Sequence, residues 1–206
     1  MKINKTFALT VLISMLAGLF IGGQIVTSRT AKLNTTDDSA EAGFARDMGD
    51  HHQQAVEMSF IIRDRSDDSA VRLLAFDIIN TQATQRGIMM GWLEQWGLTP
   101  TTTRPHLAWA GSSDHQNEHS VHGMIMPGMA TTQEIEKLRS LKGKEADILY
   151  MQLMIRHHHG GVNMAKDLIS LGKRAEVKQL AQTMVNGQQA EIELLTQMLQ
   201  DRGASP

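Results

Sequence analysis

Residues 48–58 read MGDHHQQAVEM, and residues 154–164 read MIRHHHGGVNM. Both stretches place Met, His, His and Met at the same offsets, and they lie 106 positions apart. The register extends without a gap over residues 44–97 and 150–203, where twelve of 54 positions are identical. We interpret the two segments as copies of one ancestral helical hairpin, so both copies should have the same fold.

Each copy carries apolar residues at helical spacing in two successive segments. A turn at residues 64–69 separates the two helices of the first copy, and Gly97 is placed as a helix stop. In the second copy, Gly172 is predicted to end the first helix and Gly203 to end the second. No strand-like alternation of useful length is present. The sequence therefore predicts an all-α protein with a ferritin-like four-helix bundle.

The bundle is expected over residues 38–203, with a crossover at residues 98–143 between the hairpins. Thr131 and Glu134 have the spacing of a capping box, which predicts a short helix as far as Leu141.

Composition excludes several classes of function. The chain of 206 residues has no cysteine, which rules out disulfides, thiolate zinc sites and cysteine nucleophiles. A net charge of −2 gives no basic footprint for nucleic acid. Aromatic residues are only 4%, whereas there are 14 Met and 9 His, and both enriched residues can ligate a soft metal.

The N-terminus has the pattern of a targeting segment. Lys2 and Lys5 precede an uncharged, mostly apolar run over residues 6–28. This run is longer than a usual signal-peptide core, so an uncleaved anchor is favoured over a cleaved signal peptide within residues 1–30. Positive charge before the run places the rest outside the cytoplasm. We therefore expect an exported, periplasmic or extracytoplasmic protein, anchored in the inner membrane.

The repeated motif is the candidate metal site. Offsets of three and four residues place its members on one side of a helix, and Ala55 and Gly161 leave room where the helices should meet. Imidazole and thioether ligands without a carboxylate favour Cu(I), and imidazole also suits Cu(II). Single Met residues fit ordinary core packing equally well, but four buried His need partners. The predicted ligands are Met48, His51, His52, Met58, Met154, His157, His158 and Met164.

Neighbouring His residues point about 100° apart on a helix, so one of each pair is expected to be the inner ligand and the other a rim or second ligand. His159 has no His counterpart in the first copy and is expected at the surface. Folding each hairpin about its turn places Gln82 and Gln188 near the His level, where they are predicted to accept hydrogen bonds from the rings. An ordinary buried polar network is an equal alternative. Gln85 and Glu191 could belong to the same layer.

A second group of His and Met residues lies in the crossover. It is either an auxiliary copper site or a solvated linker whose Met residues cover one end of the bundle. Its members are His115, His119, His122, Met124, Met126 and Met129.

These features together resemble the bacterial domain-of-unknown-function family 305. The resemblance rests on the doubled motif, on HGMIMPGM at residues 122–129, and on Gln188-x-x-Glu191-Ile192, and it covers about residues 40–203. It implies a ferritin-like fold, export and an association with copper resistance, and some members resemble periplasmic copper-binding proteins. The first copy departs from the pattern with Gln85-Arg86.

The predicted function is copper binding, in which an exported protein sequesters the ion or transfers it to a copper-handling partner. One alternative is a metal-free, membrane-tethered interaction module. The other is a ferritin-like oxidoreductase, which is disfavoured because a di-iron site needs Glu-x-x-His motifs and the sequence contains none. No catalytic activity is expected.

Overall fold

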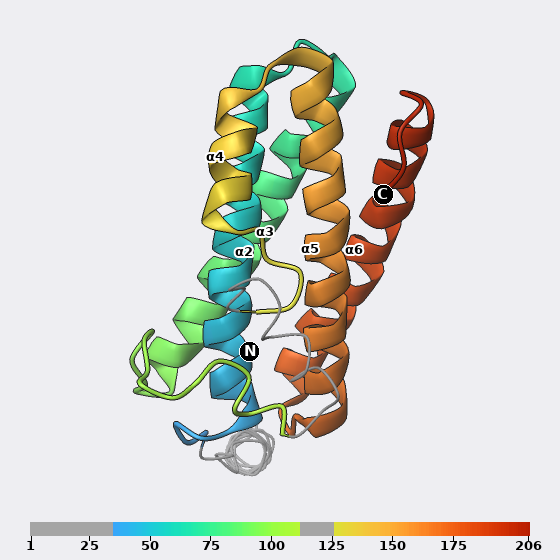
Figure 1. Ribbon diagram of the computed structural model, residues 1–206. Helices are drawn as coiled ribbons and strands as arrows, with labels where there is room; N and C mark the ends of the chain where they lie inside the picture. Colours follow the sequence, from blue (N-terminus) through green and yellow to red (C-terminus); the bar gives the residue numbers. More distant parts are fainter. Residues whose placement is uncertain (1–34, 112–125) are drawn as a thin grey trace, which may run out of the picture. The chain divides into compact units, whose positions relative to one another are not determined.

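The computed structural model describes residues 35–111 and 126–206, and within these ranges the chain is all-α (Figure 1). Its helices are α2 (Ala40–Arg65), α3 (Ser69–Gln95), α4 (Thr132–Ser140), α5 (Gly143–Leu171) and α6 (Ala175–Gln200). The four long helices form a bundle, which confirms the predicted all-α class. The predicted N-terminal anchor lies outside the described residues. Within the described ranges, no helix has the length and apolarity needed to cross a membrane.

The bundle consists of two hairpins. Helix α2 packs along α3, helix α5 packs along α6, and the hairpins meet mainly through α2 and α5. The two central helices are therefore the ones that carry the repeated motif. Ser39 caps α2 through its side chain, and Asp68, which lies inside the turn predicted at residues 64–69, caps α3. Gly97 and Gly203 follow α3 and α6 with positive φ angles of 72° and 71°, a conformation that favours glycine.

The crossover adds the short helix α4, which packs against α2 and α5 (Figure 1). Its N-terminus contains the predicted capping box. The Thr131 side chain accepts a hydrogen bond from the Glu134 backbone N–H, and the Glu134 carboxylate accepts one from the Thr131 backbone N–H.

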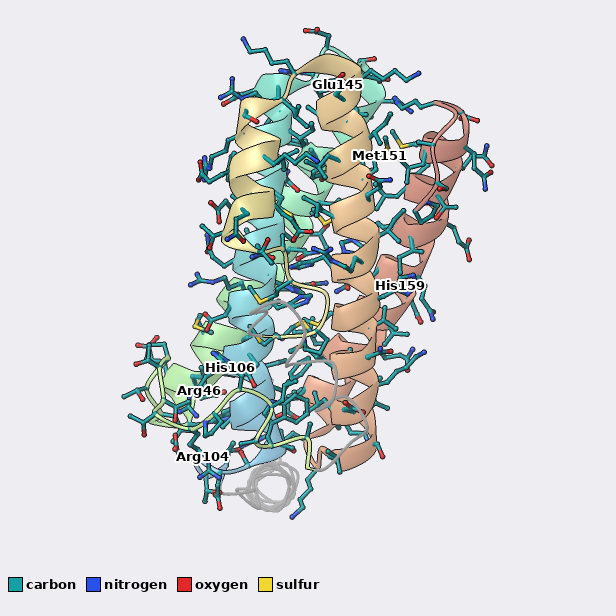
Figure 2. All side chains as sticks on the ribbon, in the orientation of Figure 1. Arg46, Arg104, His106, Glu145, Met151 and His159 are labelled. Carbon is teal, nitrogen blue, oxygen red and sulfur yellow. The ribbon has the colours of Figure 1, made fainter. Side chains whose placement is uncertain are left out.

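A buried carboxylate holds the start of the crossover against α2. Asp47 accepts hydrogen bonds from the backbone N–H of Leu107 and the indole N–H of Trp109, both at 2.8 Å, and lies 2.6 Å from His106 Nδ1. Trp109 packs on Gly43, where a Cβ atom would lie 2.3 Å from the indole ring. Figure 2 places His106 at the end of the bundle opposite Glu145 at the start of α5.

The apolar core is divided into two clusters along the bundle. Met58 and Met154 belong to the cluster beside α4, whereas Met48 and Met164 belong to the cluster beside Leu107. The His residues of the motif lie between these methionines in sequence, so the core is interrupted by a polar layer at mid-length.

Candidate metal centre

Four imidazoles from α2 and α5 form the polar layer. His51, His52, His157 and His158 are each 0% exposed. The rings of His51 and His157 stack across the interface between the hairpins, with centroids 3.7 Å apart and planes inclined by 32°. The rings of His157 and His158 have centroids 6.3 Å apart. The structure thus brings the two motif copies face to face and places all four rings inside, with none at a rim.

Two of the rings have equivalent partners in the two hairpins. His52 Nε2 lies 2.7 Å from Gln85 Oε1 on α3, and His158 Nε2 lies 2.5 Å from Glu191 Oε2 on α6. Residues 85 and 191 are related by the same offset of 106 as the two histidines. Since each oxygen accepts, both rings donate from Nε2, and in the neutral form of a ring Nδ1 then carries the lone pair.

These contacts correct the predicted partners of the rings. Gln82 and Gln188 are buried as expected, at 3% and 5% exposure. However, Gln82 has no hydrogen-bond partner for either side-chain atom among the described residues, and the acceptors are Gln85 and Glu191. The prediction chose residues directly opposite each His level, whereas the acceptors lie three residues further along α3 and α6.

The partner of His51 comes from residues 126–130, which we call the strap. His51 Nε2 lies 3.1 Å from the Pro127 carbonyl oxygen, so this ring also donates from Nε2. Gln54 fixes the strap at two points, because its Nε2 donates to the Ala130 carbonyl at 2.9 Å and its Oε1 accepts from the Ala130 N–H at 2.6 Å. Gly160 of α5 permits this approach, since a Cβ atom there would lie 2.0 Å from the Pro127 oxygen.

The layer leaves several ring nitrogens without partners. Burying a polar atom without a hydrogen bond lowers the stability of the fold. Such atoms therefore indicate either a position that binds a ligand or a loss of stability that the fold tolerates. In the described parts of the chain, the buried ring nitrogens that lack a partner are Nδ1 of His51, His52 and His158, and both nitrogens of His157.

The electrostatics of the layer favour neutral rings. Burial lowers the pKa of His51 to about 3 and that of His52 to about 4, with the neighbouring imidazoles adding to the effect. Burial also lowers the pKa of His157 well below its usual range, and His51 is the next cause. A metal ion binds only the neutral imidazole, so these rings are in the correct state at neutral pH.

The four predicted thioethers do not form one group with the rings. Met48 and Met164 lie in one core cluster together with Met126 of the strap, whereas Met58 and Met154 lie in the other. The imidazole layer is therefore flanked by thioethers on both sides. All five side chains are at most 2% exposed.

The rings are not yet arranged around one point. Within residues 35–111 and 126–206, no three His, Asp or Glu side chains have the geometry of a metal site. The faces of the His51 and His157 rings lie too close together to admit an ion between them, so an ion would have to bind at the ring edges, where the nitrogen lone pairs lie. Gly161 does not supply the predicted room for an imidazole, because Gln188 Oε1 would lie 2.4 Å from a Cβ atom there. Nevertheless, the donor set and the unpartnered nitrogens fit a soft metal ion.

The crossover cluster is only partly described. His115, His119, His122 and Met124 lie outside the described residues. Met126 is buried and Met129 is half-buried, and both pack against the core cluster that contains Met48. His159 is exposed on α5, as predicted (Figure 2).

Sequence reasoning missed the strap contacts. The Pro127 contact uses a backbone oxygen, which no residue pattern reveals, and Gln54 has Gly160 as its counterpart in the second copy. Gln85 and Glu191 were predicted to belong to this layer, but the offset of 106 could not identify them as the ring acceptors, since it relates Gln82 to Gln188 in the same way.

Solved structures with the same fold include two proteins of one family. A DUF305 protein from Streptomyces coelicolor, whose description calls it secreted, is 50% identical with a TM-score of 0.74, over 82% of this chain and 98% of that chain. A DUF305 fragment from Deinococcus radiodurans is 31% identical with a TM-score of 0.62, over 76% and 92% of the two chains.

The Cu(II)-bound form of CopM is also similar, with 28% identity and a TM-score of 0.59 over 79% of this chain and 97% of that chain. No curated protein sequence matches the chain significantly. The family model described as "Domain of unknown function (DUF305)" matches residues 41–199, which is most of the chain. This family-model match and the 50% identity to the Streptomyces protein over 82% of this chain show that the chain belongs to the DUF305 family.

Proposed function

We propose that this protein is an exported copper-binding protein that sequesters copper or transfers it, with His and Met side chains as ligands. The observation that carries the proposal is the buried layer of four imidazoles, in which five ring nitrogens have no hydrogen-bond partner among residues 35–111 and 126–206. Thioethers on both sides of the layer supply further soft ligands. The similarity to CopM in its Cu(II)-bound form adds support.

In this proposal copper is the cargo that the protein carries, and the protein's activity is to bind it. Three of the rings donate from Nε2, so Nδ1 is the atom that each can offer to an ion. Hydrogen bonding at the other ring nitrogen is the usual way in which proteins orient a metal-binding imidazole. No catalytic role is assigned to the site.

Export is part of the proposal. It is supported by the two lysines and the uncharged run at residues 6–28, and by the description of the Streptomyces relative as secreted. Fractionation of cells that express the full chain tests it. We expect the protein outside the cytoplasm and attached to the membrane by residues 6–28. Recovery of the intact chain from the cytosol would contradict export, and recovery as a free periplasmic protein would contradict the anchor.

Metal analysis of purified protein tests the site. Protein from copper-supplemented cells should contain copper, and the double substitution His52→Ala/His158→Ala should remove most of it. His159→Ala is the matched control, because this neighbouring His is exposed and should leave the copper content unchanged. Circular dichroism should show that every variant remains helical.

The crossover cluster is the main rival site. This site is tested by substituting His115, His119, His122 and Met124 with Ala. Substitution is preferred to deletion of the whole cluster, because a deletion that included the strap would also break the contacts of His51 and Gln54. Copper that is lost in this variant but retained in His52→Ala/His158→Ala would overturn the assignment to the imidazole layer.

A further inference from the structure

The ring–acceptor pairs of His52 and His158 are equivalent in the two hairpins and differ in the charge of the acceptor. The duplication relates His52 to His158 and Gln85 to Glu191, and both rings donate from Nε2 to the side chain of the outer helix. In the α2–α3 hairpin the acceptor is a neutral amide, whereas in the α5–α6 hairpin it is a carboxylate. Among the described residues, Glu191 is the one carboxylate that is hydrogen-bonded to a ring of the layer.

Charge at this position acts strongly on the rings. The His158 side chain is 0% exposed and that of Glu191 is 22% exposed, so the pair is largely shielded from water. An imidazole that donates its N–H to a carboxylate has more electron density on its other nitrogen and is a better ligand than one that donates to an amide. The carboxylate also offsets part of the positive charge that an ion brings into a buried layer.

We propose that Glu191 is a positioning and charge-balancing residue that makes the two half-sites unequal, so that His158 binds the cargo ion more strongly than its counterpart His52. This inference rests on the proposed function, since it describes how the same layer holds the ion. Glu191 and Gln85 occupy equivalent positions in the two copies and make the same contact, and they differ in charge.

Substitution at the two acceptors tests the inference directly. Glu191→Gln keeps the shape and the acceptor oxygen but removes the charge. Affinity for Ag(I), a redox-inert probe for Cu(I), should fall about 10- to 100-fold, which is the usual effect of changing the partner of a metal-binding ring. Gln85→Glu introduced into Glu191→Gln moves the charge to the other hairpin and should restore most of the affinity.

The charge of the probe ion separates electrostatics from ring orientation. Coulomb energy is proportional to the charge of the ion, so the loss of affinity on Glu191→Gln, on a logarithmic scale, should be about twice as large for Cu(II) as for Ag(I). A residue that merely orients the ring would cause equal losses for the two ions and would gain nothing from the charge-swapped variant.

The third measurement compares how much Ag(I) affinity each of the two rings contributes. His158→Ala should lower Ag(I) affinity more than His52→Ala in the natural sequence, and this order should reverse in the charge-swapped variant. Thermal unfolding of the metal-free proteins identifies any variant that has lost its fold, and Glu191→Gln, which keeps the side-chain shape, supplies the result if an Ala variant fails.

The possible results are distinguishable. Unchanged affinity in Glu191→Gln, or equal losses for both ions without recovery in the charge-swapped variant, would overturn the inference and leave the proposed function standing. Absence of Ag(I) and Cu(II) binding in the unmodified protein would overturn the proposed function itself.

Discussion

At the scale of single residues, burial changes the pH at which protons compete with copper. An imidazole in water titrates near pH 6.5, and on that value alone copper affinity would fall between neutral and mildly acid pH. Burial lowers the pKa of His51 to about 3 and that of His52 to about 4. We therefore expect affinity to change little between pH 7 and pH 5 and to fall steeply near pH 4. Ag(I) competition titrations measure this, and a large loss between pH 7 and pH 6 would contradict it.

The same lowered pKa values predict acid sensitivity of the metal-free fold. The folded pKa is below the unfolded value of about 6.5, so the folded state disfavours the charged ring. The stability that neutral His51 and His52 contribute is complete above about pH 6.5 and decreases as the pH falls towards the folded values. Urea unfolding of metal-free protein should give a lower free energy of unfolding at pH 5 than at pH 7. His52→Ala/His158→Ala should show a smaller decrease.

At the scale of elements, the strap depends on a close approach to α5. Gly160→Ala would place a Cβ atom 2.0 Å from the Pro127 oxygen and must displace the strap from His51. We expect a loss of roughly 1–3 kcal/mol in the free energy of unfolding, as for other overpacked sites, and a weaker affinity for Ag(I).

Gly187→Ala in α6 is the matched control for this change. No atom of the described part of the chain lies within 4 Å of the added Cβ atom, so the variant should gain about 0.5–1 kcal/mol from its better helix propensity. Chemical unfolding measures both variants. A Gly160→Ala protein as stable as the control would show that the strap does not bind tightly to α5.

The elements also show what the sequence could and could not predict. Helix spacing, the Thr131 capping box and the offset between the copies predicted the helices and the meeting of the motif faces, because these features are local or periodic. The separation of Met48 from Met58 was not predicted, although ten residues of helix extend about 15 Å and cannot converge on one ion. The contact of Pro127 with His51 was not predictable, since it depends on the path of a loop.

At the scale of the whole molecule, an ion in the layer would connect the two hairpins. The rings of His51 and His157 belong to different hairpins, and the hairpins meet mainly through α2 and α5. A ligand that binds only the folded state stabilises it, by about 2.7 kcal/mol at a free concentration of 100 times Kd. Ag(I) should therefore raise Tm in the unmodified protein and in His159→Ala, but not in His52→Ala/His158→Ala. An equal rise in all three proteins would indicate binding elsewhere.

A second connection between the hairpins lies at the end of the bundle. Glu41 of α2 is 5% exposed, and its Oε1 accepts hydrogen bonds from the backbone N–H groups of Lys173 and Arg174, which join α5 to α6. Glu41→Ala leaves both donors without this acceptor and should cost about 1–3 kcal/mol.

Glu57→Ala is the control for the Glu41 substitution, because it removes an exposed ion pair with Arg139 and should cost no more than about 1 kcal/mol. Urea unfolding compares the two variants. Equal stability would show that the Glu41 contacts add nothing to the association of the hairpins.

The strap has a consequence for how the duplicated halves can evolve. Two identical hairpins that associate as separate chains keep every pair of equivalent positions the same, because one coding sequence specifies both. In this single chain, Pro127 contacts His51, whereas among the described residues neither ring nitrogen of His157 has a hydrogen-bond partner. Fusion into one chain therefore allows equivalent positions in the two halves to mutate independently, so that each half can acquire a different function.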